Sequence, residues 1–267
     1  MSPQMIDIGV NLTNRSFHKD REEVLARAEA EGVTPLIITG TSVASSQEAA
    51  RYSELYPGKL YSTAGVHPHD VKECGEGTLE RLRELAALPQ VVAIGECGLD
   101  YNRDFSPRDV QRHWFREQVR LAEEIGMPLF LHERDAHTDF AAIMREHPAM
   151  IAKSVVHCFT GTGEELHAYL GMGFHIGITG WICDERRGQH LRELVKDIPL
   201  DRLMIETDAP YLTPRDMRPK PKDGRNEPAF LAHIVKVVAS CMNRDEEEVA
   251  RATFETTKAF FHIDSEN

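Results

Sequence analysis

The sequence predicts an α/β fold, a closed (β/α)8 TIM barrel, and three observations lead to that prediction. Short aliphatic runs alternate with longer charged stretches of helical periodicity along the 267 residues. Eight such runs occur, and their composition is typical of parallel strands buried on both faces. No glycine-rich nucleotide-binding sequence follows any run, which disfavours the alternative, a doubly wound open sheet.

The elements follow one another in strict alternation. The predicted strands cover residues 6–12, 35–40, 60–66, 91–94, 128–131, 154–157, 174–178 and 203–205. The predicted helices cover residues 20–31, 45–55, 77–88, 107–125, 136–146, 163–172, 184–195, 228–241 and 245–260. Ser106-Pro107 and Asn226-Glu227-Pro228 are typical helix starts, because proline fits the first turn.

Composition indicates a single domain over residues 1–267. Hydrophobic residues make up 41% of the chain, enough for one large core, and a single barrel of this kind takes roughly 250 residues. No apolar run approaches the roughly 18 residues that span a bilayer, and the first residues lack the pattern of a secretory signal. The five cysteines are odd in number and scattered, as in a reducing compartment. We therefore expect a cytoplasmic protein with no membrane partner.

Charge disfavours a sequence-blind clamp on duplex nucleic acid. The formal net charge is −12, whereas such a clamp neutralises many phosphates with a basic surface. One proline-rich segment, residues 214–225, is locally basic and should overhang the mouth of the barrel; its basic residues are Arg215, Arg218, Lys220, Lys222 and Arg225, against Asp216 and Asp223. Arg186 and Arg187 follow the seventh strand and could extend the basic surface of this segment. The alternative is an ordinary solvated surface.

Aromatic residues flank the same mouth: Tyr101, Phe105, Trp181 and Tyr211. They could stack on unpaired bases, each worth about 1–3 kcal/mol. The alternative is that they only seal the top of the barrel.

Polar residues stand at the ends of five predicted strands. His67 and His69 follow the third strand, and the fourth, fifth, sixth and eighth strands end with Glu96, His132, His157 and Asp208. Catalytic residues of a TIM barrel lie at these carboxyl-terminal strand ends. Imidazoles and carboxylates together form a mixed nitrogen and oxygen set that suits divalent cations. The alternatives are structural histidines, an ion-paired Glu96 and a helix-capping Asp208.

Arg134 lies two residues after His132, where its guanidinium could meet an anionic substrate with two parallel hydrogen bonds. Its alternative partners are Asp135 and Asp139. Cys158 is a weaker candidate nucleophile. Its neighbour His157 ends a strand, so the two side chains should point to opposite faces.

Four segments, in this order along nearly the whole chain, resemble the TatD family of metal-dependent deoxyribonucleases, whose barrel is of the amidohydrolase type. They are Gly65-Val66-His67-Pro68-His69, Ile94-Gly95-Glu96 with Gly98-Leu99-Asp100, Val156-His157-Cys158-Phe159-Thr160-Gly161 and Glu206-Thr207-Asp208-Ala209-Pro210-Tyr211. The segments 180–188 and 225–228 resemble the family's namesake branch.

The resemblance implies roles for individual residues. Glu96, His132 and His157 match the family's metal ligands, and Asp208, a further expected metal ligand, matches its aspartate after the eighth strand. Asp208 and Glu96 are the expected catalytic residues. His67 and Arg134 match positions that line the phosphate pocket. The family usually opens with D-x-H-x-H, which supplies two imidazoles to a first metal. This chain has Asp7-Ile8-Gly9-Val10-Asn11 instead, so we expect at most one firmly held ion, with Asp208 freer to act as a base.

The resemblance also implies the reaction. We expect a Mg²⁺-dependent exonuclease, with Mn²⁺ or Zn²⁺ as alternative metals, that hydrolyses single-stranded or frayed DNA. RNA is a further candidate substrate, and a monomer with a role in DNA repair or turnover is the expected context. Two alternatives remain, namely a small-molecule amidohydrolase or phosphoesterase on the same barrel, and a catalytically silent binding protein, which Gly9 and Asn11 suggest.

Overall fold

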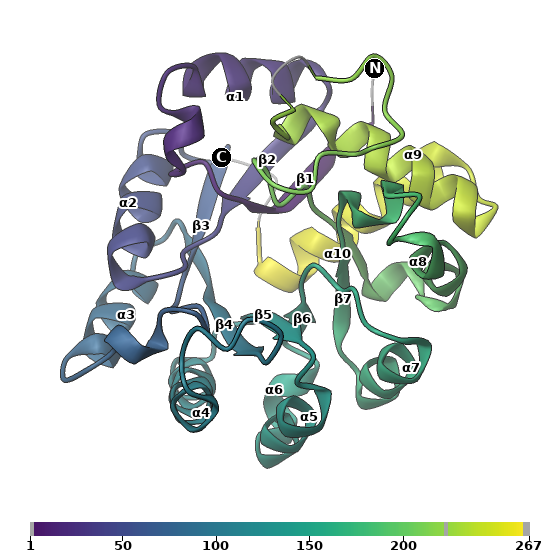
Figure 1. Ribbon diagram of the computed structural model, residues 1–267. Coiled ribbons are helices and arrows are strands. Elements are labelled where there is room, and N and C mark those ends of the chain that lie inside the picture. Colours follow the sequence, from purple (N-terminus) through teal and green to yellow (C-terminus); the bar gives the residue numbers. More distant parts are fainter. Residues whose placement is uncertain (1–2, 222–223, 264–267) are drawn as a thin grey trace.

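Eight parallel strands form a nearly closed barrel. The computed structural model describes residues 3–221 and 224–263. The strands pair in sequence order from β1 to β8, and an isolated parallel bridge joins Val10 of β1 to Ala209, in the segment after β8. Figure 1 shows the strands surrounded by helices. This arrangement confirms the predicted TIM barrel.

The strands are β1 (Met5–Val10), β2 (Val33–Ile38), β3 (Leu60–Ala64), β4 (Val91–Asp100), β5 (Leu129–Arg134), β6 (Ser154–Val156), β7 (His175–Ile178) and β8 (Leu203–Ile205). The helices are α1 (Arg21–Ala30), α2 (Val43–Glu54), α3 (Thr78–Ala86), α4 (Arg108–Ile125), α5 (His137–Glu146), α6 (Pro148–Ile151), α7 (Gly163–Met172), α8 (Gln189–Leu194), α9 (Leu231–Met242) and α10 (Glu246–Phe261). Among the described residues, no helix is both long and apolar enough to cross a membrane.

Strands β4 and β5 run further than the sequence predicts. Glu96 and His132 therefore lie within their strands and do not end them. The reason is the pair Gly95 and Gly98, which interrupts the aliphatic pattern but continues the strand with positive φ. A β-carbon at Gly98 would lie 1.8 Å from the carbonyl oxygen of His132, so only glycine lets the two strands approach this closely.

Two helix predictions need correction. The predicted helix 184–195 begins only at Gln189, because the Asp184 side chain accepts a hydrogen bond from the backbone N–H of Arg186 and holds the preceding residues in a turn. The four-residue helix α6 was not predicted, since one turn is too short to show helical periodicity.

The barrel interior is apolar at one end and polar at the other. Ile6, Val92 and Met204 belong to one buried cluster with Phe260 and Phe261 at the end of α10, and this cluster fills the end of the barrel where the strands begin. Polar side chains are thereby confined to the opposite, carboxyl-terminal end of the strands. The packed apolar end holds the strands in place, and the polar ends of the same strands carry the site.

Asp7 fastens the first strand to the last. Its buried carboxyl accepts hydrogen bonds from the backbone N–H and hydroxyl of Thr207 and from the backbone N–H of Gly9. Burial raises the pKa of Asp7 to about 8, despite these hydrogen bonds. The bond pattern sets the register between β1 and the segment after β8, which carries Asp208.

Candidate active site

A cavity of about 690 Å³ opens at the carboxyl-terminal ends of the strands. This volume is in the range of small-molecule and cofactor sites. Eight of the predicted site residues line it: His67, Glu96, His132, Arg134, His157, Trp181, Asp208 and Tyr211. Arg186, Arg187, Arg215, Arg218 and Lys220 do not line this cavity, which we call the mouth.

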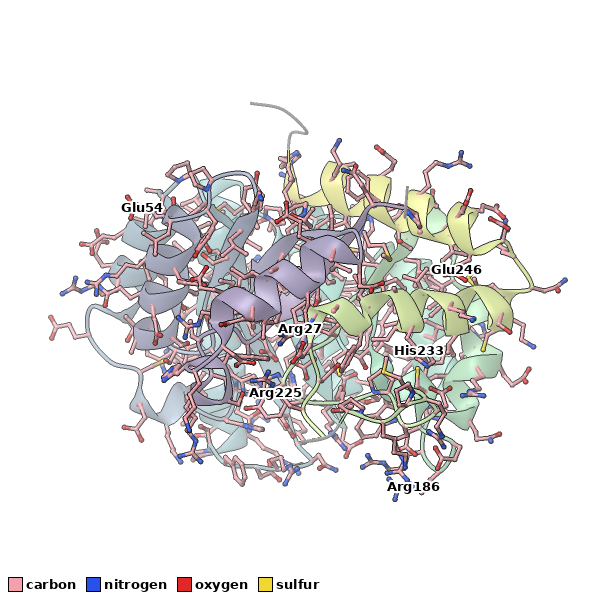
Figure 2. The ribbon with its side chains drawn as sticks, turned by 90° about the horizontal axis from the view of Figure 1, so that it is seen from above. Arg27, Glu54, Arg186, Arg225, His233 and Glu246 are labelled. Atoms are coloured by element: carbon pink, nitrogen blue, oxygen red, sulfur yellow. The ribbon has the colours of Figure 1, made fainter. Side chains whose placement is uncertain are left out.

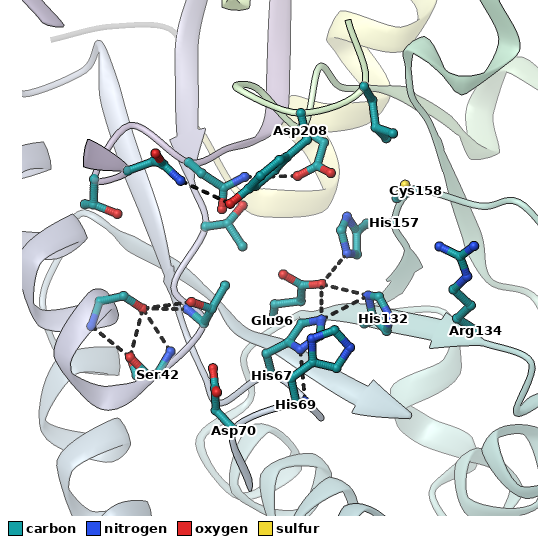
Figure 3. Close-up of a pocket in the computed structure, with 18 of the residues that line it drawn as sticks. Ser42, His67, His69, Asp70, Glu96, His132, Arg134, His157, Cys158 and Asp208 are labelled. Carbon is teal, nitrogen blue, oxygen red and sulfur yellow. Dashed lines mark hydrogen bonds and ion pairs between the residues drawn. The ribbon is translucent and has the colours of Figure 1, made fainter. Parts of the chain in front are cut away.

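Glu96 is the centre of the mouth. One of its oxygens, Oε1, lies 2.7 Å from His157 Nε2, 2.9 Å from His132 Nδ1 and 3.3 Å from His67 Nε2 (Figure 3). Three imidazoles, one within β5 and the other two in the segments that follow β3 and β6, thus converge on a single buried carboxylate oxygen.

The charges of this cluster stabilise one another. Burial opposes ionisation of Glu96, but the charges of His157 and His67 outweigh it and hold the pKa of the carboxyl well below its usual range. Burial likewise opposes protonation of His157, yet the Glu96 and Glu206 carboxylates raise the pKa of this imidazole well above its usual range. The two carboxylates Glu96 and Glu206 therefore favour a positive charge at the base of the mouth, whether it is a proton on His157 or a cation.

The donor set fits a divalent cation. Ligand atoms of His67, Glu96 and His132 all lie within 4.8 Å of one another, and His157 contacts the same carboxylate oxygen. His132 Nε2 is buried without a hydrogen bond, 3.4 Å from Asp100 Oδ2. Imidazoles with a carboxylate are a ligand set used for first-row divalent metals.

Asp208 lies on the other side of the mouth from His67 and His69, as Figure 3 shows. Its Oδ1 accepts a hydrogen bond of 3.0 Å from Asn11 Nδ2, and its backbone is left-handed, with φ of 53°. Burial raises the pKa of Asp208 to about 7. This carboxyl can therefore take up or release a proton near neutral pH.

Comparison with known proteins decides the family. The family model described as "TatD related DNase" matches residues 6–262. The chain belongs to this family. It is 52% identical over 259 residues to the "3'-5' ssDNA/RNA exonuclease TatD" of Pantoea vagans, covering 97% of this chain and 100% of that one. The protein of the same name from Citrobacter rodentium is also 52% identical, with 97% and 98% covered.

Solved structures agree with this assignment. The TatD family hydrolase from Entamoeba histolytica has a TM-score of 0.88 at 31% identity, covering 99% of this chain and 100% of that one. The TatD homologue YJJV from Escherichia coli has a TM-score of 0.89 at 28% identity, covering 98% and 99%. Membership of the TatD related DNases confirms the predicted class: the protein is a metal-dependent hydrolase of the nuclease type.

Two further carboxylates, which the sequence analysis did not single out, contact the histidines of this TatD-type centre on the side away from Glu96. Glu206 is fully buried; its Oε2 lies 3.3 Å from His157 Nδ1 and its Oε1 accepts the backbone N–H of Cys158. Asp100 Oδ2 lies 2.7 Å from His69 Nε2 and 3.4 Å from His132 Nε2. Glu206 directly follows β8, at the carboxyl-terminal strand end where the catalytic residues of a barrel lie, and that position could have indicated it.

Glu206 also explains the missing strand-1 imidazole. A β-carbon at Gly9 would lie 2.4 Å from Glu206 Oε2, and one at Gly177 would lie 2.7 Å from Glu206 Oε1. The carboxylate therefore occupies the space that a side chain at residue 9 would need. In this member of the family, an acidic group stands where the D-x-H-x-H pattern expects a histidine.

Cys158 does not follow the predicted alternation. It lines the mouth together with His157, because its backbone is left-handed, with φ of 47°, directly after β6. Burial raises the pKa of the Cys158 thiol well above its usual range. A thiol that stays protonated is a poor nucleophile, so chemistry through Cys158 is disfavoured.

Arg134 extends into the mouth and pairs with neither of its alternative partners. Asp139 instead accepts hydrogen bonds from Arg112 and Tyr101, and Asp135 accepts one from Asn102. The Arg134 guanidinium carbon lies 5.6 Å from the centre of the Trp181 ring. Tyr101 and Phe105 do not line the mouth itself. Phe105 is 54% exposed and its ring centre lies 4.7 Å from that of His69, which does line the mouth.

The predicted basic segment is less uniform than its charge count suggests. Arg225 lies apart from the mouth and binds Asp20 and Glu227. Arg215 is paired with Asp184 and Glu185, whereas Arg218 and Lys220 are exposed. Lys222 and Asp223 lie outside the described residues. Tyr211 is 54% exposed at the mouth and accepts a hydrogen bond from Asn14.

Proposed function

We propose that the protein is a 3'–5' exonuclease that hydrolyses single-stranded DNA and RNA from their ends. The observation that carries this proposal is the convergence of three imidazoles on Glu96 Oε1 at the base of a mouth that also contains Arg134 and Asp208. The names of the relatives from Pantoea and Citrobacter support the substrate and the polarity.

Glu96, His132 and His157 are the proposed ligands of a divalent metal, with His67 facing the same carboxylate oxygen. We propose Mg²⁺ as the metal, with Mn²⁺ and Zn²⁺ as alternatives. Bound there, a divalent ion supplies a water of lowered pKa and polarises a phosphoryl oxygen.

The protein's own groups complete the proposed reaction. Arg134 holds the negative charge of the scissile phosphate through two parallel N–H donors. His67, whose Nε2 faces Glu96 in the structure, would add a neutral N–H donor, because burial lowers the pKa of this imidazole. Asp208 accepts the proton of the attacking water, and a pKa of about 7 suits a base that works near neutral pH. Asn11 fixes the orientation of Asp208 by donating to its Oδ1.

We further propose one firmly bound ion per free enzyme. Glu206 fills the space next to Gly9, and Asn11 uses its amide nitrogen to donate to Asp208, so no imidazole is available on β1. A second ion would then enter only with the substrate phosphate. Calorimetric titration of the substrate-free protein should give about one tight site; two tight sites would contradict the proposed count.

Digestion of end-labelled substrates tests the function. Single- and double-stranded DNA and RNA, labelled at either end, are incubated with Mg²⁺, Mn²⁺ or Zn²⁺. We expect stepwise shortening of single strands from the 3' end, with Glu96→Ala as the inactive control. Internal cuts would contradict the proposed exonuclease activity, and so would turnover of simple esters in place of oligonucleotides.

The wider context is also proposed. One barrel domain acts as a cytoplasmic monomer in DNA repair or turnover. The five cysteines are free in the structure, which supports a reducing compartment.

A further inference from the structure

A smaller cavity of about 220 Å³ adjoins the mouth. Trp181 and Leu212 line both cavities, so they form the partition between them. Arg186, Arg187 and Arg215 line only the smaller one, which we call the side cavity. The first two come from the loop after β7 and the third from the loop after β8.

Asp184 orients these three arginines. Its buried carboxylate accepts hydrogen bonds from Arg186 Nε and Nη2 at 3.2 Å each and from Arg187 Nε at 3.1 Å. Arg215 Nε lies 3.6 Å from the same group. A single carboxylate thus fixes three guanidinium groups at the wall of one cavity.

The side cavity keeps an excess of positive charge. Three arginines face Asp184 and the exposed Glu185, a balance of 3 − 2 = +1. The side chains of Arg186 and Arg187 are 56% and 57% exposed, and neither terminal nitrogen of Arg187 hydrogen-bonds to another described residue. Free, oriented guanidinium donors are suited to bind the oxygens of a phosphate. Figure 2 shows Arg186 at the edge of the molecule.

Trp181 lies between a guanidinium group of the mouth and one of the side cavity. Its ring centre lies 4.3 Å from the guanidinium carbon of Arg187 and 5.6 Å from that of Arg134. Arg134 lines the mouth and Arg187 the side cavity, so one indole lies within reach of a cation on each side of the partition. An aromatic ring with flanking cations is the arrangement on which unpaired bases stack while their phosphates meet the positive charges.

We propose that the side cavity binds the phosphodiester next to the one that is cleaved, while Trp181 stacks on the intervening base. The volume supports a phosphate, because about 220 Å³ is below the roughly 300 Å³ at which pockets for larger ligands begin. The inference rests on the proposed function and specifies it: the substrate is a single strand with at least two phosphodiester bonds.

A length series tests the side cavity. The substrates are a dinucleotide with one phosphodiester bond and a trinucleotide with two, both without terminal phosphates. Wild-type enzyme should have a KM at least about tenfold lower for the trinucleotide, since charge-assisted hydrogen bonds to phosphate are strong. Arg187→Gln should remove this gain, so that the KM values of the variant for the dinucleotide and the trinucleotide differ by less than about twofold. Arg244→Gln, at an exposed arginine paired with Glu248 between α9 and α10, is the matched control and should keep the gain.

Binding gives a readout that does not depend on hydrolysis. The same oligonucleotides are titrated into the Glu96→Ala variant, and quenching of tryptophan fluorescence is followed, with Trp181→Phe to assign the signal. We expect quenching by the trinucleotide that Arg187→Gln weakens and Arg244→Gln does not.

The outcomes separate the two proposals. If the wild type hydrolyses both substrates without a length gain, or if Arg187→Gln affects both equally, the side cavity is not a phosphate site. If the wild type hydrolyses neither, the proposed exonuclease activity is wrong, and the binding titration still decides whether the side cavity holds a phosphate.

Discussion

The two sides of the mouth are built from different chemistry. On the side of β3 to β6, His67, His132 and His157 surround Glu96. On the side of β8 and β1, the amide of Asn11 is the only side chain of the described residues that hydrogen-bonds to the Asp208 carboxyl. We call these the imidazole side and the carboxyl side.

The difference separates the pKa values of two carboxyl groups in one cavity. On the imidazole side the pKa of Glu96 is held well below its usual range, although burial opposes this, while on the carboxyl side burial raises the pKa of Asp208 to about 7. Such a separation marks which group remains a permanent anion and which exchanges protons. The imidazole side is thus suited to hold a cation, and the carboxyl side to act as a base.

The largest effect should come from the imidazole side. Glu96→Ala removes the carboxylate that three imidazoles share, and hydrolysis should be abolished. The loss should exceed the roughly 10²–10⁴-fold of removing a general base, because the cation site itself is lost. His157→Ala should behave in the same way. Steady-state kinetics at saturating metal is the measurement, with circular dichroism to verify folding.

Glu123→Ala is the matched control. It removes a carboxylate 2.6 Å from the imidazole of His147, away from the mouth, and should keep wild-type kcat. Near-normal kcat in Glu96→Ala would show that the imidazole side has been assigned wrongly.

On the carboxyl side, Asp208→Asn should lower kcat by about 10²–10⁴-fold while metal affinity changes little. A base acts when ionised, so kcat/KM of the wild type should rise with pH through about 7 and then level off. A bound cation favours the carboxylate, so saturating metal should move this rise to lower pH. The variant should lose the rise. A pH–rate profile of the variant that still rises near 7 would assign the base to another group.

Glu206 belongs to the carboxyl side but contacts a histidine of the imidazole side. With Glu206 accepting the Nδ1 proton of His157, Nε2 is left to face Glu96 and the metal. Glu206→Gln should weaken metal affinity by about 10–100-fold, as found for such supporting residues. Calorimetric titration measures this directly. Glu123→Gln, at the carboxylate that contacts His147 away from the mouth, should leave the metal affinity unchanged. Equal metal affinity in the Glu206 and Glu123 variants would mean that Glu206 only fills space.

Much of the imidazole side could be predicted from the sequence. All eight strands are visible as aliphatic runs, and His67, Glu96, His132 and His157 follow or continue them. Local pattern is enough here because barrel topology brings successive strand ends together. The length of β4 was missed because Gly95 and Gly98 break the aliphatic pattern, while their fit against β5 depends on tertiary contact.

The remaining features depend on contacts between distant segments. Glu206 meets His157 across 49 residues of sequence, and Arg215 meets Glu185 across 30. A charge count of residues 214–225 cannot show that Arg225 turns away to Asp20 or that Arg215 is already paired. The sequence of one segment shows which charged groups it contains, but not which of them are already paired with a distant residue.

The smallest effect should come from the exposed loop that extends the carboxyl side. Neutralising Arg215, Arg218 and Lys220 together should raise KM for oligonucleotides more than it lowers kcat, because remote phosphate contacts bind ground and transition states alike. Since Arg215 is paired, the double variant Arg218→Gln/Lys220→Gln isolates the exposed charges. Each exposed contact is worth at most about 1 kcal/mol, so a few-fold rise in KM is expected.

The salt dependence of binding gives the sharper test of this loop. Each lost phosphate contact on a single strand should reduce the slope of log K against log salt by about 0.7, because fewer counterions are released. Arg51→Gln/Lys59→Gln is the matched control: both residues are exposed, and Lys59 directly precedes β3, at the opposite end of the barrel. The control should keep the wild-type slope. If the loop variant also keeps it, the substrate strand does not contact Arg218 or Lys220.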